Sequence, residues 1–365
     1  MRTPERIDQV IPAIVEHDAV SNHTFEAQRL LREMGLGSEI YARIIGPGCA
    51  GRVRPIEELS SSDAERQWLL YQSSIGSPAA EVFAHHRGRK LLDYHNITPA
   101  ELVERWIPPL GAEARLGRRQ LAELAPLVAA GFADSAYNAA ELATAGFART
   151  RVVPLLVETA NVEASPDAAV LAGLMASKAA GGSDWLFVGQ LAPHKAQHDL
   201  VKAFACYRRA YDERARLHLV GREMGQTYKD ALRRFVASLG LGAAVELTGS
   251  VPATTLAAYY AAADVFVCCS EHEGFCAPVV EAMHRRVPVV AIARAALPET
   301  IGDGGVLLGE RDPVLVAAAV HEVLATPGAR EALVEAGARQ AGRYGLDAAR
   351  RAFRAAVDEE LAVAL

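Results

Sequence analysis

The stretch Val265-Phe-Val-Cys-Cys-Ser-Glu-His-Glu-Gly-Phe-Cys-Ala-Pro-Val-Val-Glu281 joins a buried strand to a helix through a polar loop. Residues 265–269 are apolar throughout, which is typical of a strand in a parallel sheet that helices cover on both faces. The polar residues 270–272 indicate an exposed loop, and the apolar residues after Pro278 predict a helix that contains Glu281. The stretch therefore predicts one strand–helix unit of an α/β fold.

The same order recurs through the second half of the chain. Further strands are expected at 185–189, 217–221, 245–249 and 287–291, and helices at about 198–212, 229–238 and 254–262. Short apolar strands that alternate with longer helices indicate a parallel sheet.

The first half is less regular but similar in kind. Strands are expected at 9–15, 39–45, 68–71, 90–93 and 150–156, and helices at 24–34, 114–130 and 134–145. Residues 158–182 are rich in Ala, Ser, Pro and Gly, which favours a linker, and a last helix is expected at about 347–364.

A chain of 365 residues is too long for one ordinary hydrophobic core, so two domains are expected. We expect a first domain at 1–180, a second domain at 181–346 and a final helix at 347–365. Both would be Rossmann-like and doubly wound, facing each other across a cleft formed by the carboxyl ends of their strands.

Bulk properties exclude several classes of protein. The formal charge of −6 argues against a nucleic-acid-binding protein, which needs a basic surface. No apolar run reaches the length of about 18 residues that a transmembrane helix needs, and the first residues lack the layout of a signal peptide. We therefore expect a cytoplasmic protein, and acidic residues within the basic stretch 87–119 argue against peripheral membrane contact.

Glu273 and Glu281 are the first candidates for chemistry. Carboxylates near a strand end can accept hydrogen bonds from sugar or ribose hydroxyls, and the N–H groups at the start of the helix favour an anion. Alternatively, both carboxylates simply face solvent and stabilise the helix dipole. Spacing alone leaves these two interpretations open.

The pattern Ser-x-x-Glu-Gly-Phe-x-x-Pro-x-x-Glu-Ala-Met, which begins at Ser270, resembles the Glu-x7-Glu signature of the family-four retaining glycosyltransferases, which have the GT-B fold. Leu186-Phe-Val-Gly-Gln-Leu-Ala-Pro-His-Lys195 is similar to the phosphate loop of that family. Further similarity lies at 261–267 and 297–305, and more loosely at 17–24 and 93–98.

The resemblance implies that residues 1–180 form the acceptor-side domain, that residues 181–346 form the donor domain, and that the final helix at 347–365 returns to the first domain. It also implies roles for the residues of this signature. Glu273 would bind the hydroxyls of the donor sugar, and Glu281 would hold the ribose. Backbone N–H groups near Gly274, Phe275 and Cys276 would face the sugar and the phosphates.

The phosphate loop departs from the family pattern at one position. Gly189 and Lys195 match it, and Lys195 would neutralise the diphosphate, but Gln190 stands where relatives have Arg. Gln donates hydrogen bonds but carries no charge. Arg222, which follows the next strand, is the candidate to replace the missing cation.

The segment before the first helix permits two interpretations. Ser21, Asn22 and Thr24 are each suitable helix caps. The resemblance instead implies that the backbone N–H groups of Ser21 and Asn22 face the diphosphate, with Asp18 and His23 near the acceptor.

Four more residues complete the candidate set. His95, at a predicted strand end, matches the family histidine that reaches the donor sugar from the first domain. Ser74, at another predicted strand end, is a candidate for contact with the acceptor, although a simple turn would explain this segment equally well. Val251 and Leu256 could flank the nucleobase, although ordinary packing explains both.

The resemblance therefore implies a retaining hexosyltransferase that uses a nucleotide-diphosphate sugar of the UDP or GDP type, with no cofactor and no metal ion. A fixed cation and a helix start can stabilise the departing diphosphate without a metal. The leaving phosphate would help to take the proton of a small-molecule or saccharide acceptor. A non-catalytic nucleotide-sugar-binding relative and a sugar-nucleotide epimerase remain as alternatives.

Overall fold

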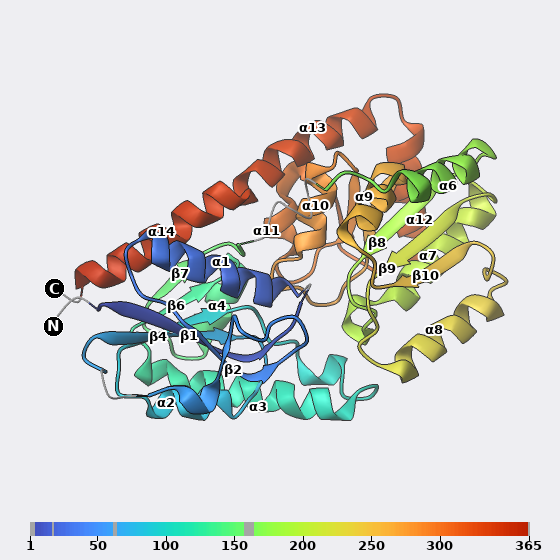
Figure 1. Cartoon of the computed structure of the whole chain (residues 1–365). Coiled ribbons are helices and arrows are strands. Elements are labelled where there is room, and N and C mark those ends of the chain that lie inside the picture. The colour runs from blue at the N-terminus through green and yellow to red at the C-terminus, as the bar shows by residue number, and fades with distance from the viewer. Residues whose placement is uncertain (1–3, 17, 61–63, 157–163, 364–365) are drawn as a thin grey trace. The chain divides into compact units, whose positions relative to one another are not determined.

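Each half of the chain builds its own parallel sheet in the computed structural model, which describes residues 4–16, 18–60, 64–156 and 164–363 (Figure 1). One unit comprises residues 1–104, 108–158 and 344–365, and the other comprises residues 105–107 and 159–343. We refer to them as unit 1 and unit 2 and describe each by itself.

Unit 1 contains a seven-stranded parallel sheet in the order β3-β2-β1-β4-β5-β6-β7 among its described residues. Its strands are β1 (Arg6–Ile14), β2 (Ile40–Ile45), β3 (Arg54–Pro55), β4 (Gln67–Ser73), β5 (Lys90–Tyr94), β6 (Ala130–Ala133) and β7 (Thr150–Val152). Its α-helices are α1 (Ala19–Glu33), α2 (Ala79–His85), α3 (Pro108–Leu124), α4 (Ala136–Thr144) and α14 (Leu346–Val363).

Successive residues of the central strands pack on opposite faces of this sheet, as the alternation of a strand requires. On one face, Leu70 packs in a core with residues of α1 and with Phe353 of α14. On the other face, Leu69 packs with residues of α2, α3 and α4, among them Phe83. The segment 344–365 therefore completes the core of unit 1, although it lies at the opposite end of the chain from β1.

Unit 2 contains a six-stranded parallel sheet in the order β10-β9-β8-β11-β12-β13 among its described residues. Its strands are β8 (Asp184–Val188), β9 (Arg216–Val220), β10 (Val245–Gly249), β11 (Val265–Cys268), β12 (Val289–Ile292) and β13 (Gly305–Leu308). Its α-helices are α6 (Ala168–Ala179), α7 (Gln197–Ala210), α8 (Gln226–Ser238), α9 (Ala253–Ala262), α10 (Ala277–His284), α11 (Leu297–Ile301), α12 (Pro313–Ala325) and α13 (Ala329–Ala341).

Two predictions of secondary structure are wrong. The helix expected at 114–130 ends at Leu124, and residues 130–133 form β6. The strand lies between β5 and β7 and has no space for a larger side chain, because a Cβ atom on Gly131 would lie 2.8 Å from Leu142. The alanine and glycine residues near 130, which suggested the end of a helix, are therefore the small residues that a crowded strand needs.

The linker expected at 158–182 contains a helix instead. Residues 168–179 form α6, and the carboxylate of Asp167 accepts hydrogen bonds from the N–H groups of Ala169 and Val170 at its start. The Ala-rich composition that suggested a linker is also the one with the highest helix propensity. Residues 157–163 of the expected linker lie outside the described residues.

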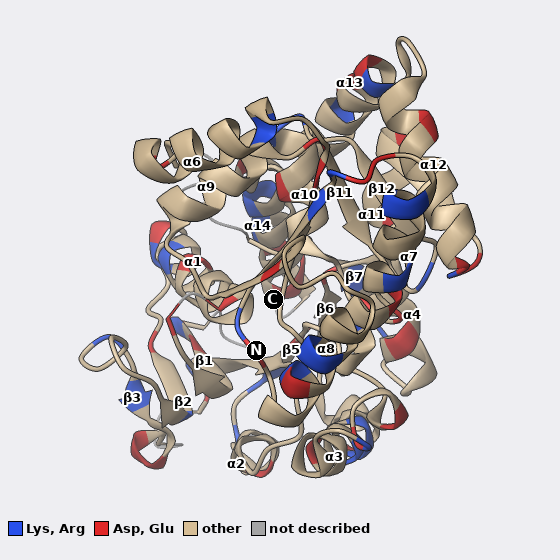
Figure 2. Cartoon of the chain, turned by 90° about the vertical axis from the view of Figure 1, so that its right-hand side faces the viewer, with Lys and Arg blue, Asp and Glu red and all other residues tan. Residues whose placement is uncertain are grey.

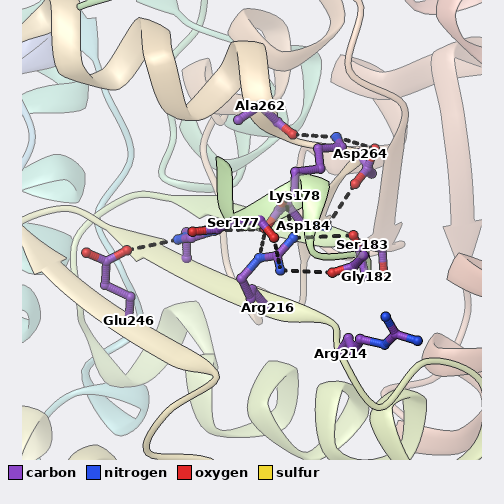
Figure 3. Close-up of polar contacts among 12 residues, drawn as sticks. Ser177, Lys178, Gly182, Ser183, Asp184, Arg214, Arg216, Glu246, Ala262 and Asp264 are labelled. Atoms are coloured by element: carbon purple, nitrogen blue, oxygen red, sulfur yellow. Dashed lines mark hydrogen bonds and ion pairs between the residues drawn. The ribbon is translucent and has the colours of Figure 1, made fainter. Parts of the chain in front are cut away.

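An ion pair and a hydrogen bond attach α6 to the amino ends of the strands in unit 2 (Figure 3). Lys178 of α6 donates to Asp264, which directly precedes β11, at 2.7 Å. Arg216 donates to Asp184 at 2.6 Å and to the carbonyl oxygen of Ser177 at 3.0 Å. The amino ends of these strands are therefore occupied by structural contacts, and the candidate residues lie at the carboxyl ends.

Basic and acidic residues alternate along the helices rather than forming a basic stripe. Figure 2 shows both signs on α3 and on α13. This mixture agrees with the small negative net charge. No described helix combines the length and the apolar character that crossing a bilayer requires.

Candidate functional site

The strand order of unit 2 reverses between β8 and β11, which are neighbours in the sheet. In open α/β sheets, ligands bind outside the carboxyl ends of the strands at such a reversal. Lys195 lies in the short turn 193–195 beyond β8, and Glu273 lies in the loop beyond β11. The topology therefore brings two segments that are distant in sequence to one place.

Lys195 and Glu273 form an ion pair at this reversal. The Nζ atom of Lys195 donates to Oε2 of Glu273 at 2.7 Å, and the side chains are only 19% and 7% exposed. Burial lowers the pKa of Lys195, but the charge of Glu273 and the hydrogen bond outweigh it, so the net pKa is raised. Lys195 is therefore cationic at neutral pH.

The loop after Glu273 is held by the segment at α11. The N–H group of Ala296 donates to the carbonyl oxygen of Glu273 at 3.1 Å, and the hydroxyl of Thr300 donates to that of Phe275 at 2.7 Å. Cys276 caps α10 with a left-handed φ of 69°. These contacts place the backbone of residues 274–276 at the start of α10, where helix N–H groups favour an anion.

Two thiols lie beside Glu273. The ligand atoms of Cys268, Glu273 and Cys276 lie within 4.8 Å of one another, close enough to hold a metal ion. However, the ammonium of Lys195 already pairs with Glu273 and opposes a further cation there. Cys276 hydrogen-bonds Cys268, whose thiol donates in turn to Ser270 at 3.2 Å. The thiols therefore satisfy one another without an ion.

Glu281 lies in α10, as expected. Its Oε2 atom accepts a hydrogen bond from the hydroxyl of Tyr260 in α9 at 2.8 Å. Burial raises the pKa of Glu281, and this hydrogen bond opposes the rise. Val251 and Leu256 are half-buried and pack against the core of unit 2, which explains their apolar character without a nucleobase.

The ends of β8 and β9 approach each other closely. A Cβ atom on Gly221 would lie 2.0 Å from the carbonyl oxygen of Gly189, so only glycine fits here. The N–H group of Leu191 donates to the carbonyl oxygen of Arg222 at 2.8 Å. This bond places the backbone of Arg222 directly beside the segment that contains Gln190. The side chain of Arg222 is exposed.

The strand order of unit 1 reverses between β1 and β4. At this edge, Asp18 follows β1, Ser74 follows β4 and His95 follows β5. The N–H group of His95 donates to the carbonyl oxygen of Ser73 at 2.8 Å. Ser74 is half-buried beside this contact.

The ring of His95 is buried between hydrogen-bond acceptors. Its Nδ1 atom lies 3.1 Å from Oδ1 of Asp134, its Nε2 atom lies 2.5 Å from Oε1 of Gln72, and its side chain is 1% exposed. Burial lowers the pKa of His95, but the charges of Asp134 and Asp93 outweigh burial and raise it to about 9.

The start of α1 differs from the prediction. The helix begins at Ala19, and its cap is Asp18, whose carboxylate accepts from the N–H group of Ser21 at 3.0 Å. Ser21, Asn22 and Thr24 lie inside the helix, so the expectation that they cap it is wrong. The N–H group of Asn22 donates to the carbonyl oxygen of Asp18 at 2.9 Å. A diphosphate that used these N–H groups would therefore have to displace Asp18.

His23 was expected near the acceptor, but its side chain is completely buried. Its Nε2 atom lies 2.9 Å from Asp93, and its Nδ1 atom accepts from the N–H group of Leu156 at 3.0 Å. Both ring nitrogens are therefore occupied within unit 1. His23 thus stabilises unit 1 and offers no atom to an acceptor.

The ligand atoms of His23, Asp93 and His95 also lie within 4.8 Å of one another. A metal ion needs a free lone pair on each ring. Both nitrogens of His23 are engaged, as are both nitrogens of His95. This group is therefore a hydrogen-bonded cluster rather than a metal site.

The sequence pattern did not single out Asp134, Gln72 or Tyr260. Asp134 directly follows β6, so it would have been a strand-end candidate if 130–133 had been recognised as a strand. Gln72 lies within β4, where nothing distinguishes it from a buried structural residue. Tyr260 had no local signal, because its partner Glu281 is in another element.

Comparison with known proteins places unit 2 in a family. Residues 178–340 match the family described as glycosyl transferases group 1. A D-inositol 3-phosphate glycosyltransferase from Geodermatophilus obscurus is 33% identical over 256 residues, which are 67% of this chain and 56% of that protein. Its counterpart from Kineococcus radiotolerans is 31% identical over 271 residues, which are 68% of this chain and 61% of that protein. The chain thus spans little more than half the length of these relatives.

A third relative and two solved structures extend the comparison. A GDP-mannose-dependent alpha-(1-6)-phosphatidylinositol monomannoside mannosyltransferase from Mycolicibacterium smegmatis is 34% identical over 159 residues, 41% of either chain. Sucrose-phosphate synthase from Thermosynechococcus elongatus has a TM-score of 0.75 at 18% identity, covering 98% of this chain and 100% of that one. Anabaena HepE, in complex with UDP and glucose, has a TM-score of 0.76 at 16% identity, covering 97% and 100%. The expected α/β class with two doubly wound, GT-B-type sheets is confirmed.

Proposed function

Through residues 178–340 this chain belongs to the group 1 glycosyltransferases, and from that membership we propose that it is a retaining transferase that uses a nucleoside-diphosphate sugar. The observation that carries the proposal is the Lys195–Glu273 ion pair at the strand reversal of unit 2. A cation beside a carboxylate suits a ligand that combines phosphates with sugar hydroxyls.

Lys195 has the charge for the diphosphate. Negative charge develops on the leaving diphosphate as the bond from the sugar C1 to the phosphate oxygen breaks, and a fixed cation stabilises that charge. The start of α10, with residues 274–276, adds helix N–H groups. These groups supply the positive potential that a metal ion supplies in other transferases, which supports a metal-independent reaction.

Arg222 is the proposed second cation, in place of the family Arg that Gln190 replaces. Its exposed position and the hydrogen bond between the backbones of Leu191 and Arg222 support this assignment. Gly189, on the same loop, allows the close approach of backbone to phosphate.

Glu281 is proposed to bind the ribose hydroxyls of the donor. One of its oxygens accepts from Tyr260, which orients the carboxyl group in α10. Glu273 is proposed to bind the hydroxyls of the sugar itself. Val251 and Leu256 remain candidates for contact with the base.

The reaction proposed is a front-face substitution. The acceptor oxygen bonds to the sugar C1 on the face that the diphosphate leaves, and the acceptor proton passes to an oxygen of the leaving phosphate. Configuration is retained because attack and departure occur on the same face of C1, and no enzyme nucleophile takes part. Asp18 and Ser74 are the candidates of unit 1 for the acceptor. Both ring nitrogens of His95 are engaged by Asp134 and Gln72, so its ring has no free nitrogen for a hydroxyl of the donor sugar.

The donor is proposed to be of the UDP or GDP type. The names of relatives support both, since HepE was solved with UDP and the mycobacterial relative is GDP-mannose-dependent. For the acceptor we propose a small molecule or a saccharide. The curated relatives named for D-inositol 3-phosphate support a small polar acceptor.

A thermal-shift panel of UDP, GDP, ADP and dTDP, each with and without EDTA, tests the donor proposal. A ligand at a hundred times its dissociation constant adds roughly 2.7 kcal/mol to stability. We expect one diphosphate to raise the Tm, without an effect of EDTA. If none does, the nucleotide-site assignment is wrong.

The variants Lys195→Ala and Arg222→Ala then test the two cations. We expect Lys195→Ala to abolish the rise in Tm. We expect Arg222→Ala to lower the affinity for the diphosphate by about tenfold, which corresponds to about 1.4 kcal/mol. An unchanged affinity in Arg222→Ala would remove Arg222 from the phosphate site.

A non-catalytic nucleotide-sugar-binding relative is the second candidate, because Gln190 removes one cation from the phosphate loop. Product analysis with the stabilising donor and a panel of acceptors distinguishes the two. A transferase releases the diphosphate only with a suitable acceptor, whereas a binding protein releases none.

A further inference from the structure

A chain of hydrogen bonds runs from His95 to a backbone carbonyl in unit 1. The Nε2 atom of His95 lies 2.5 Å from Oε1 of Gln72. The Nε2 atom of Gln72 lies 2.8 Å from Oε1 of Gln9, and the Nε2 atom of Gln9 lies 2.9 Å from the carbonyl oxygen of Thr24. Gln9 and Gln72 are both completely buried.

The carbonyl group of Thr24, at the end of this series of hydrogen bonds, determines which group donates and which accepts in each bond. The carbonyl oxygen of Thr24 can only accept, so Gln9 must present its NH₂ group there. Its own oxygen then accepts from the NH₂ group of Gln72, and the oxygen of Gln72 is left facing His95. Turning either amide round would place two acceptors against each other, so His95 must carry a proton on Nε2.

The other ring nitrogen faces a carboxylate. Nδ1 of His95 lies 3.1 and 3.2 Å from the two oxygens of Asp134. Burial raises the pKa of Asp134, and the charge of His95 and the hydrogen bond between them oppose the rise. In its ionised form a carboxylate accepts hydrogen bonds and donates none. From these two sides we infer that His95 is held as a doubly protonated imidazolium, and that Gln72 and Asp134 are positioning residues that maintain this charge.

The adjacent histidine shows the opposite arrangement. The ring centroids of His23 and His95 are 4.7 Å apart. Nδ1 of His23 accepts from the N–H group of Leu156, so it carries no proton, and Nε2 donates to Asp93. His23 is therefore neutral, and the two rings differ in charge because their partners differ.

The charges around His95 support its cationic state. Asp134 at the end of β6, Asp93 in β5 and Asp18 at the start of α1 each stabilise the positive charge. The pKa of His95, raised to about 9, agrees with this arrangement. The charge is therefore present at neutral pH and is lost as the pH rises through about 9.

The consequence for the reaction rests on the function proposed above. A ring with both nitrogens protonated and bonded cannot accept the proton of an acceptor hydroxyl. His95 would instead act as a fixed positive charge at the carboxyl edge of the first sheet. Loss of the His95 proton at alkaline pH should therefore lower activity.

The protonation state can be measured without any assay of activity. The experiment records ring nitrogen–proton NMR spectra of the full chain labelled with ¹⁵N-histidine at pH 7.5, assigned with His95→Gln and His23→Gln. We expect two protonated nitrogens for His95 and one for His23. His218 is an internal control for the cation, because its nitrogens lie 3.2 and 2.9 Å from Asp184 and Glu246. A His95 ring with one protonated nitrogen at this pH would overturn the inference.

The role of Asp134 is tested by the pH profile of kcat/KM. Asp134→Asn removes one negative charge, so we expect its alkaline limb to move to lower pH by about one unit or more. Asp312→Asn is the matched control: it is an N-cap in α12, where Asn caps equally well, and should leave the profile unchanged. A fall in activity of Asp134→Asn at every pH without a shift of the limb would contradict positioning through charge.

The two measurements fail separately. If no donor and acceptor give turnover, the proposed function fails, while the NMR spectrum of the wild-type chain still decides whether His95 is an imidazolium. If turnover occurs and His95 is neutral, only this inference fails.

Discussion

The ammonium of Lys195 lies 2.7 Å from a carboxylate oxygen of Glu273, although 78 positions separate the two residues. A second lysine–carboxylate pair, Lys178 and Asp264, has the same 2.7 Å separation near the amino ends of β8 and β11. The two pairs therefore lie at opposite ends of the same two neighbouring strands. Only the first lies at the edge where α/β sheets bind ligands.

Replacing Lys195 should affect catalysis more than folding. We expect Lys195→Ala to lower kcat by about 10²–10³-fold, the usual effect of removing one group that stabilises transition-state charge. Steady-state kinetics with the donor found by thermal shift would measure this.

The matched control is Lys178→Ala, which removes the ion pair at the amino edge (Figure 3). It should lower the Tm but keep kcat within about threefold, because its charge is remote from the strand reversal. Equal losses of kcat in the two variants would mean that Lys195 acts only on stability.

Removing the hydroxyl of Tyr260 should weaken nucleotide binding. Tyr260→Phe deprives Glu281 of the hydrogen bond at 2.8 Å, and we expect an increase in the Kd of the nucleoside diphosphate of about tenfold. Isothermal titration calorimetry measures the change. Tyr259→Phe removes a similar bond from Tyr259 to Glu246 and should leave the Kd unchanged. Similar Kd values for the two variants would argue against the ribose role of Glu281.

The buried His194 should make the protein less stable in mild acid. Burial, and then the charges of Lys195 and His272, lower the pKa of His194 well below its ordinary value. The unfolded chain takes up a proton near pH 6.5 while the folded chain does not, so stability is present above that pH and is lost as the pH falls.

This loss can be measured by urea denaturation between pH 7.5 and 5. We expect His194→Gln to flatten the curve, with a difference of about 1 kcal/mol per pH unit below pH 6. His85→Gln, at an exposed position, is the control and should follow the wild type. If His194→Gln also follows the wild type, His194 is not held in its neutral form.

The cap of α1 gives a prediction about stability alone. Asp18→Ala should lower the free energy of unfolding by about 0.5–2 kcal/mol, because the N–H group of Ser21 loses its acceptor. Asp18→Asn should retain most of the wild-type free energy of unfolding. Asn22→Ala should change stability by less than about 0.5 kcal/mol, since Asn22 lies within the helix. A larger loss in Asn22→Ala than in Asp18→Ala would contradict the observed cap.

Local pattern was sufficient for much of unit 2. The strands expected at 185–189, 217–221, 245–249 and 265–269 are present within about a residue as β8, β9, β10 and β11. Buried parallel strands are continuously apolar, so each is visible in a few adjacent residues. The pattern failed at β6 and α6, where runs of alanine and glycine suit a strand, a helix or a linker equally well.

The sequence by itself determined the α/β class and the candidate residues at single strand ends, because strand, loop and helix are written in consecutive residues. Only the tertiary structure decided which strand ends meet. The pairing of Lys195 with Glu273 depends on the neighbouring positions of β8 and β11, and the contact of His95 with Asp134 depends on β5 and β6. The charge of His95 depends further on a backbone carbonyl at Thr24, three hydrogen bonds away through Gln72 and Gln9. Such partners are brought together by the order of strands, which no local segment of the chain encodes.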